Sequence, residues 1–336
     1  MNNKGFITIM SLTIMVIIIF NVLYLIYVSN LEYLIINSEI NSIQSSYLSE
    51  GKIYLVLNKE KYFEKITPSI ERFIKNPSLT SIKDIYIALD EDDLSEGDTH
   101  KSIWASIFYD YDERIVLELR AKSSYNKIIK EVISKVTILN ELYELRKPII
   151  SDLTLNEKEK QVFTKYMDFL CQNINIPNLD IGMYGIYIKD FSKVKLINGS
   201  NEMIIEYYRN DINNPIKVEY IPTNNIFLLS KDNSKTTEVS FVDLNLLNGF
   251  NLSGIIYIEG SLIIENDFVF NGILIVNGNI FINPLAKVTI NGITFHKGEC
   301  EITNNLEAYY DFTEIRKYII YLPKFIDLSI RSIKVN

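Results

Sequence analysis

An uninterrupted run of 23 uncharged, mostly apolar residues at 6–28 constrains this protein more than any other feature. At about 1.5 Å of rise per residue, a helix of that length spans roughly 35 Å, which is enough to cross the hydrocarbon core of a bilayer. Lys4 is the only cation near the run, and it lies on the N-terminal side. The positive-inside rule therefore predicts a single-pass membrane protein with a cytoplasmic N-terminus, membrane lipid around 6–28 and an extracytoplasmic C-terminus.

The helical pattern continues beyond the apolar run, because no proline occurs before Pro68. We predict one helix over 6–58, roughly 80 Å long, that is apolar in its first half and amphipathic in its second. No small-x-small cleavage motif follows the run, and the run is long for a secretory signal. Apolar residues of the second half recur at spacings of about three and four: Leu31, Leu34, Ile35, Ile40, Ile43, Tyr47 and Leu48.

The first residues resemble the N-terminus of type IV pilins and pseudopilins. The match consists of Lys4 and Gly5, then Phe6, then the apolar run. In that family a prepilin peptidase cuts after the glycine and methylates the new N-terminus. The resemblance implies a leader peptide at 1–5, cleavage between Gly5 and Phe6, and N-methylation of Phe6. The alternative is an uncleaved signal anchor in which Lys-Gly occurs by chance.

Two further sites indicate the kind of subunit. Most family members have a glutamate at the fifth mature position, where this chain has Met10. That carboxylate is thought to pair with a neighbouring subunit's N-terminal amine, and its absence is associated with minor subunits at the tip. The stretch SYLSEG at 46–51, which contains Glu50, resembles a segment of PilX-type minor pilins. The resemblance assigns Met10 and Glu50 to filament packing. The alternatives are a divergent subunit elsewhere in the filament and a solvated Glu50.

The part of the chain beyond the helix predicts an α+β protein. Alternating apolar residues from Ile103 to Leu139 predict an antiparallel β meander, with Trp104 as a core anchor or strand-face residue. Shorter helices are expected at 66–74 and within 151–177. We divide this part into a pilin-like head with the meander at 59–150, a helical insert with irregular strands at 151–248, a repeat at 249–298 and a capping segment at 299–336.

Glycines punctuate the repeat. The sequence GIIYIEG at 254–260 returns as GILIVNG after 18 residues, and a third copy, GITFHKG, follows after 20 more. Short strands at this spacing predict a short parallel β-helix of two to three rungs, similar to repeats of PilX-like Gram-positive proteins and of bactofilins. Each rung would have three sides, with corners at 259–260, 266–267 and 271–272.

The terminal strands and the apolar faces of the predicted β-helix must be shielded from water by other segments. We expect its ends to be capped by 219–247 and by a helix near 314–321. The face that contains Ile255 and Ile273 is apolar, and so is the opposite face with Ile256 and Leu274. That opposite face requires another element or a partner subunit.

Charge and reactive side chains exclude several functions. The chain has 34 Lys and Arg against 42 Asp and Glu and no long basic run, so we expect no nucleic-acid partner. Two cysteines and two histidines are too few for a zinc site or a thiol nucleophile pair. His100 and His296 lack a catalytic companion, and the acidic residues Glu259, Glu265 and Asp267 fall in a single rung. We expect no enzyme activity, metal or cofactor.

Two features stay open at this level. We interpret the acidic segment 90–98 as a solvated loop, because its spacing departs from an EF-hand, with calcium binding as the alternative. Cys171 and Cys300 either pair outside the cytoplasm or stay free.

Together these features predict a minor pilin-like subunit of a type IV pilus or a related, type II secretion-like pseudopilus. It would help to initiate assembly or lie at the tip, and it would be extracellular after assembly. Expected partners are other pilin or pseudopilin subunits, the prepilin peptidase and the inner-membrane assembly platform. The alternative is a permanently anchored cell-surface β-solenoid protein with no filament.

Overall fold

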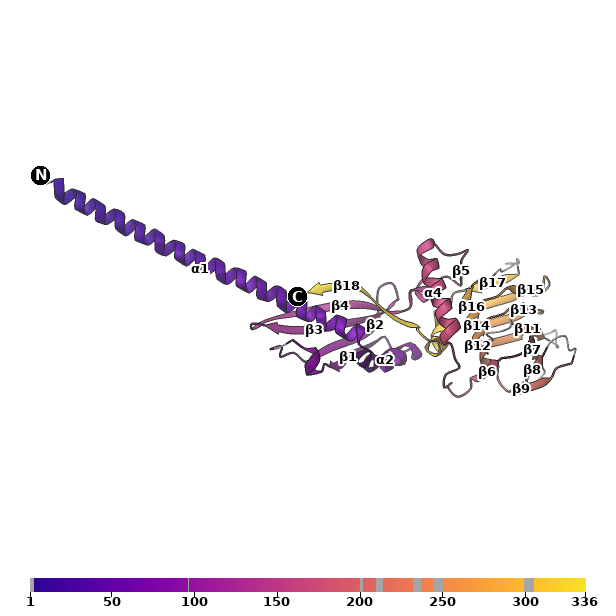
Figure 1. The fold of residues 1–336 in the computed structure, drawn as a ribbon. Coiled ribbons are helices and arrows are strands. Elements are labelled where there is room, and N and C mark those ends of the chain that lie inside the picture. Colours follow the sequence, from indigo (N-terminus) through magenta and orange to yellow (C-terminus); the bar gives the residue numbers. More distant parts are fainter. Residues whose placement is uncertain are drawn as a thin grey trace.

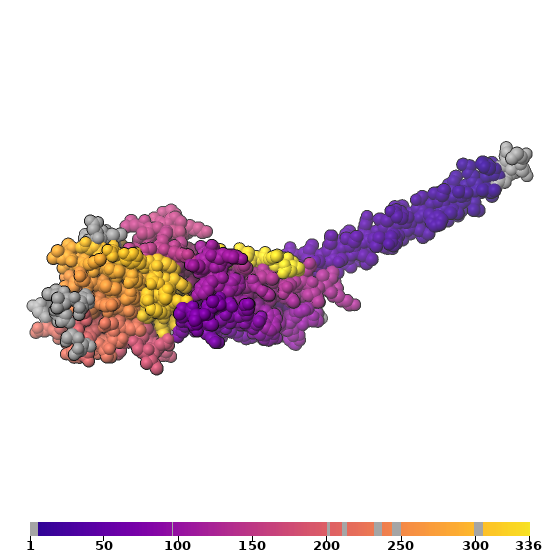
Figure 2. Space-filling view, turned by 180° about the vertical axis from the view of Figure 1, so that it is seen from behind, coloured from indigo at the N-terminus to yellow at the C-terminus, as the bar shows by residue number. Residues whose placement is uncertain are grey.

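A computed structural model describes residues 3–95, 97–199, 202–209, 214–231, 237–243, 250–298 and 305–336. A long helix, α1 (Asn3–Asn58), projects from a β-rich head (Figures 1 and 2). The predicted α+β class and the single long N-terminal helix are both confirmed. The first half of α1 contacts no other part of the described chain, so its side chains are exposed all round.

The second helix is longer than the sequence suggested. Helix α2 (Glu60–Lys75) begins almost directly after α1, whereas we expected a helix at 66–74. Tyr62 is buried on the same side as Ile66 and Ile70, so the helix gains apolar burial by starting earlier. Pro68 lies inside the helix, where it removes one backbone hydrogen bond without ending the element.

A five-stranded antiparallel sheet packs against α1 and α2 in the order β1-β2-β3-β4-β18. Its strands are β1 (Ser81–Ala88), β2 (Ser102–Tyr109), β3 (Ile115–Tyr125), β4 (Ile128–Leu139) and β18 (Ile326–Val335). The predicted meander is therefore present as β2-β3-β4. The β3–β4 turn is at Asn126 and Lys127, both with positive φ. Trp104 is a strand-face residue with 45% of its side chain exposed, so its interpretation as a core anchor is wrong.

Strand β18 was not anticipated. It belongs to the segment 299–336, which we expected to cap the repeat, yet it pairs with β4 of the head sheet. The end of the described chain therefore lies beside α1, where the helix leaves the head (Figure 1).

Helix α4 (Glu157–Asn173) confirms the helix predicted within 151–177. It starts with a capping box in which Asn156 and Glu159 satisfy each other's backbone amides. Short elements precede it: 3-10 helix η1 (Glu91–Asp93) before β2, and α3 (Glu141–Glu144) and β5 (Ile149–Ser151) after β4.

The remaining strands form two further sheets. One has the order β17-β16-β14-β12-β10-β6, with β5 also pairing with β16, and the other has the order β15-β13-β11-β7-β8-β9. Their bounds are β6 (Tyr184–Ile188), β7 (Lys193–Asn198), β8 (Met203–Tyr208), β9 (Lys217–Ile221), β10 (Asn225–Ser230), β11 (Glu238–Asp243), β12 (Phe250–Ile258), β13 (Leu262–Ile264), β14 (Phe268–Val276), β15 (Ile280–Ile282), β16 (Val288–His296) and β17 (Leu306–Tyr309).

The strands of the repeat pair in parallel at the predicted offsets. Gly254 lies opposite Gly272, and Gly272 lies opposite Gly292, which reproduces the shifts of 18 and 20 residues. β14 continues through the expected corner at 271–272 as one strand, which bends at Gly272. Gly272 has φ +143°, a conformation that side-chain-bearing residues rarely adopt. Within the described residues the first two repeats contribute two strands each, β12 with β13 and β14 with β15, so the third side of a rung is not a separate strand.

Both apolar faces of the repeat are covered within the chain. Ile256 and Leu274 face the second sheet and pack into a core with Leu262. Ile255 and Ile273, on the other face, join a larger core that also holds Ile315 and residues of the five-stranded sheet such as Ile107. The face that we expected another element or a partner subunit to cover is thus covered by another element of the chain, the second sheet.

The two ends of the repeat are closed differently from each other. β10 and β11 extend it at one end, within the expected segment 219–247. At the other end β17 and β5 both pair with β16. Helix α5 (Phe312–Tyr318) and 3-10 helix η2 (Ile319–Tyr321) match the helix expected near 314–321, but Ile315 and Ile319 pack on the face of the sheet and not on its end.

Candidate anchor helix and its junction with the head

Helix α1 has the dimensions of a membrane anchor. Within the described part of the chain it is the one helix long and apolar enough to cross a bilayer. Gly5 lies inside α1, and Phe6 and Met10 follow with 71% and 55% of their side chains exposed. The helix therefore fits a single-pass anchor. Cleavage after Gly5 and methylation of Phe6 stay predictions.

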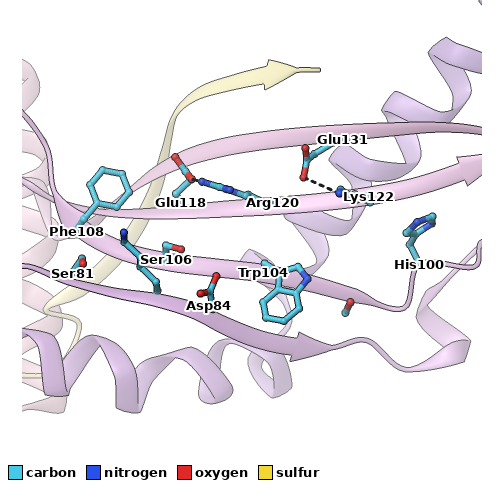
Figure 3. Close-up of a pocket in the computed structure, with 12 residues that line it drawn as sticks. Ser81, Asp84, His100, Trp104, Ser106, Phe108, Glu118, Arg120, Lys122 and Glu131 are labelled. Carbon is cyan, nitrogen blue, oxygen red and sulfur yellow. Dashed lines mark hydrogen bonds and ion pairs between the residues drawn. The ribbon is translucent and has the colours of Figure 1, made fainter.

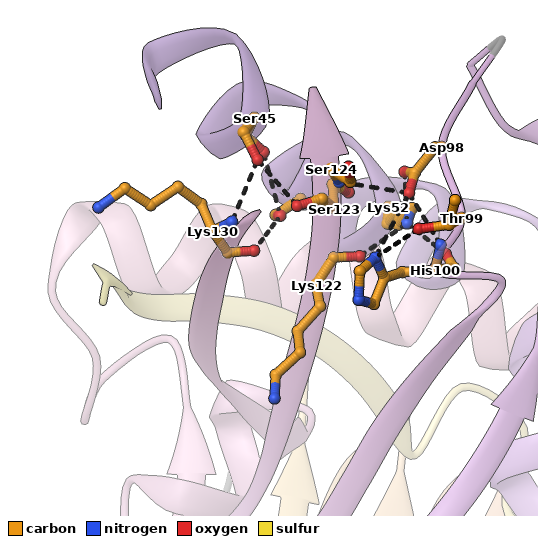
Figure 4. Close-up of polar contacts among 10 residues, drawn as sticks. Ser45, Lys52, Asp98, Thr99, His100, Lys122, Ser123, Ser124 and Lys130 are labelled. Carbon is orange, nitrogen blue, oxygen red and sulfur yellow. Dashed lines mark hydrogen bonds and ion pairs between the residues drawn. The ribbon is translucent and has the colours of Figure 1, made fainter. Parts of the chain in front are cut away.

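The last third of α1 meets the head through small polar side chains (Figure 4). The Ser45 hydroxyl donates to the carbonyl of Ser123 at 2.8 Å and accepts the backbone amide of Lys130 at 3.1 Å. The Ser49 hydroxyl donates to the carbonyl of Lys130, also at 3.1 Å. Small side chains let the helix approach the ends of β3 and β4 closely enough for these bonds. They also satisfy backbone groups of β3 and β4 at the place where α1 crosses them.

A buried ion pair completes this junction. The Lys52 ammonium lies 2.6 Å from the Asp98 carboxylate, and the two side chains are 5% and 0% exposed. Lys52 also donates to the carbonyl of Lys122 at 2.7 Å and to that of His100. Asp98 accepts the backbone amide of His100 at 3.0 Å. One lysine therefore ties α1 to the segment before β2 and to β3.

The environment of Asp98 keeps its carboxylate charged. Burial by itself raises the pKa of Asp98, but the Lys52 ammonium and the His100 amide outweigh it and hold that pKa below its usual range. Burial lowers the pKa of Lys52, and Asp98 acts against this shift by raising it.

The side of α1 that faces away from the head is apolar. Six residues follow each other at spacings of three, four and seven, and each side chain is 45–67% exposed: Tyr33, Ile36, Ile40, Ile43, Tyr47 and Tyr54. We call this set the outer stripe. Glu50 occupies the gap between Tyr47 and Tyr54 at the same heptad spacing. At 3.6 residues per turn the outer stripe lies about 180° from Ser45 and Ser49, on the opposite side of the helix.

This arrangement refines the predicted amphipathic half of the helix. From Asn41 to Lys52 the buried residues of α1 are polar, whereas further along the same helix Ile53 and Val56 join the hydrophobic core of the head. The outer stripe stays exposed on the other side. Within the SYLSEG stretch, Ser49 contacts the head, Tyr47 faces outward and Glu50 is partly exposed. The spacing of about three and four for Ile40, Ile43 and Tyr47 of this stripe was noted in the sequence, whereas the roles of Lys52 and Asp98 were missed. Lys52 is the first cation after Lys4, which is the one signal that singles it out.

The other candidate residues are engaged in local contacts. In the acidic loop, Asp90 and Asp93 pair with Lys61, and Glu91 pairs with Lys101, while Glu96 lies outside the described residues. Over the described residues no three His, Cys, Asp or Glu side chains gather as a metal site. The calcium alternative thus gains no support from this loop.

Among the described residues, the two histidines and Cys171 make separate contacts. His296 is buried and its Nε2 lies 3.0 Å from the carbonyl of Gly278. The Cys171 thiol lies 3.4 Å from Glu259, and burial raises the pKa of that thiol. Cys300 lies outside the described residues, so its pairing with Cys171 stays a prediction.

Comparison of the chain with known protein families, with curated proteins and with solved structures found no match.

Proposed function

We propose that this chain is a minor pilin-like subunit whose helix α1 passes from the membrane into the helical core of a type IV pilus or related pseudopilus. The proposal includes a cytoplasmic N-terminus, removal of residues 1–5, a methylated Phe6 and an extracytoplasmic head. In this proposal the parallel strands of the head form a short β-solenoid, since β11 to β16 alternate between two sheets and each pairs in parallel with its equivalent in the next repeat.

The outer stripe carries the proposal. A bilayer core of about 30 Å takes roughly 20 helical residues, which 6–28 already supply. Residues 33–54 therefore lie beyond the hydrocarbon, yet the side chains of the outer stripe point away from the head and stay exposed. A continuous apolar surface of this length is costly in water and is typical of an interaction site. The heptad spacing is the pattern with which one helix packs along another.

Glu50 fits the same proposal. A polar residue at one position of an apolar helical seam fixes register between partner helices, because only one alignment gives it a polar neighbour. Met10 removes the carboxylate with which other pilins hold a preceding subunit, which favours a position at the start or the tip of the fibre. The bulk of the head supports the same low-copy role.

A photo-crosslinking experiment tests the proposal in cells that build the filament. A photoreactive amino acid at Ile40 or Tyr47 is expected to crosslink to other pilin subunits. The matched control is Ser38, which is also exposed but lies on the opposite side of α1. In the same cells, mass spectrometry is expected to find a methylated Phe6 at the N-terminus.

The alternative function predicts a different result. A permanently anchored surface protein would keep Met1, and positions 40 and 47 would give no more protein crosslinks than position 38. That outcome would replace the filament proposal by the anchored β-solenoid.

A further inference from the structure

An open groove of about 660 Å³ lies on the face of the head sheet that is turned away from α1 (Figure 3). Alternate residues along β2 and the segment before it line the groove: His100, Ser102, Trp104, Ser106 and Phe108. Aromatic rings therefore recur at every fourth residue, about 13 Å apart in an extended strand, with small serines between them. This spacing leaves hollows on both sides of Trp104.

Trp104 forms an aromatic platform in the middle of the groove. Its neighbour across the sheet is Tyr86 of β1, and the two ring centroids are 5.2 Å apart at an interplanar angle of 65°. Tyr86 covers the indole from one side only. The contact with Tyr86 therefore supports the indole ring, and Trp104 is still 45% exposed. It is the single tryptophan of the chain.

Polar side chains with paired charges surround this platform. On β3, Arg120 lies directly opposite Trp104 and forms an ion pair of 2.6 Å with Glu118. Further along the groove, Lys122 lies 3.7 Å from Glu131. The carboxylates that line the groove are equal in number to the Lys and Arg side chains that line it, so these charges balance.

A bulge in β1 adds another carboxylate to the rim. The pairing of β1 with β2 shifts between Ile82 and Ile85, and Asp84 within the bulge has φ +57°. Asp84 lines the groove beside Arg120. Bulges redirect side chains and are frequent next to functional sites, and a non-glycine residue in this conformation is held there at some cost.

We propose that this groove binds an uncharged oligosaccharide, with one pyranose ring stacked on Trp104. The C–H bonds of a pyranose are weakly positive and match the negative face of an indole. Its hydroxyl groups both donate and accept, so they match carboxylate acceptors and guanidinium donors placed side by side.

The same features disfavour other occupants. A polyanion would meet Asp84, Glu118 and Glu131, and a protein partner would need a larger apolar centre than one indole and its neighbours. The oligosaccharide proposal goes beyond the proposed function and does not depend on filament assembly.

The test uses the full chain in detergent micelles, with a detergent that carries no sugar headgroup. Three neutral probes are titrated: cellohexaose, maltohexaose and N-acetylchitohexaose. Because Trp104 is the only tryptophan, its fluorescence reports on the groove directly. We expect a saturable change in emission with at least one probe, and calorimetry provides the affinity.

Two substitutions separate a real site from non-specific adsorption. Trp104→Ala is expected to weaken binding at least about tenfold, because the stacking surface is lost. Tyr111→Ala, which removes a fully exposed aromatic ring at the β2–β3 turn, is expected to leave affinity unchanged. Circular dichroism of both variants checks that the fold is retained.

Three outcomes would overturn the proposal. They are no saturable binding of any neutral probe up to about 10 mM, equal binding by the Trp104→Ala variant, and tighter binding of polygalacturonate than of all three neutral probes. None of these outcomes bears on crosslinking at Ile40, so the two proposals fail independently.

Discussion

Lys52 of α1 and Asp98 of the segment before β2 form a buried ion pair, in which Nζ and Oδ2 lie 2.6 Å apart. The same ammonium donates to two backbone carbonyls, those of His100 and Lys122. Removal of either partner leaves the other charge buried and unpaired, which costs far more than the loss of an exposed pair.

Lys52→Met and Asp98→Asn are each expected to destabilise the head by about 3–5 kcal/mol. The double variant Lys52→Met/Asp98→Asn should lose less than the sum of the single variants, because no charge stays unpaired. Chemical unfolding of the full chain in detergent measures these differences. Lys101→Met, which breaks the exposed pair with Glu91, is the control and should cost at most about 1 kcal/mol. Additive losses in the double variant would contradict coupling of the pair.

The same pair makes stability depend on pH. Because the folded protein holds the pKa of Asp98 below its usual range, the stabilisation is fully present above the unfolded pKa of about 3.9. It is lost as the pH falls through the lower, folded pKa. The thermal midpoint of the protein should therefore fall more steeply below about pH 4 than that of Asp98→Asn. Parallel curves for the two proteins would show that Asp98 does not contribute.

Gly272 and Gly51 provide a matched pair of glycine substitutions. At Gly272 a Cβ atom would lie 2.1 Å from the carbonyl oxygen of Gly254, and φ is +143°. Gly272→Ala is expected to prevent folding of the repeat or to cost more than about 3 kcal/mol. A Cβ at Gly51 meets nothing within 4 Å, so Gly51→Ala should stabilise α1 by about 0.5–1 kcal/mol. Thermal unfolding and soluble yield measure both, and a tolerated Gly272→Ala would contradict the close pairing of β12 and β14.

Gly5→Val tests the proposed leader. A branched side chain beside the scissile bond should block the peptidase almost completely and leave an intact helix in the membrane. Mass spectrometry of the N-terminus and membrane fractionation measure the two effects. Asn3→Val, outside the proposed motif, is the control and should be processed normally. Normal processing of Gly5→Val would show that the cut lies elsewhere.

Met10→Glu tests the position of the subunit in the filament. A carboxylate in the apolar part of α1 is costly unless it pairs with a cation. Met10→Glu should therefore change the copy number of the subunit or its location in the filament. The exposed position of Met10 means that folding of the head should be unaffected. Immunogold labelling of filaments and quantitative mass spectrometry provide the readouts. An unchanged location and copy number would remove the reason to place the subunit at the tip.

Much of the fold was predictable because local pattern and tertiary contacts agree. The uninterrupted helix follows from the absence of proline before Pro68, and the meander follows from alternation that matches a half-buried sheet. The register of the repeat was readable because glycines 254, 272 and 292 occupy equivalent bends. Sequence reasoning failed where distant segments meet, as for β18, whose pairing with β4 has no local signal.

The candidate sites divide in the same way. The spacing of Tyr33, Ile36, Ile40 and Ile43 shows one apolar side of a helix, but periodicity does not say whether that side meets the head. Trp104 was equally compatible with the core and with a strand face. Only the packing of β2 decided that it is exposed.

By itself the sequence determined the elements whose cause is local: the anchor-length helix, the alternating strands and the glycine spacing of the repeat. Tertiary structure alone decided which side of α1 is buried, through Ser45, Ser49 and the Lys52–Asp98 pair, and which strand completes the head sheet. The physical reason is that periodicity along a chain records that one side differs from the other. What each side contacts is decided by the free energy of packing between segments far apart in sequence.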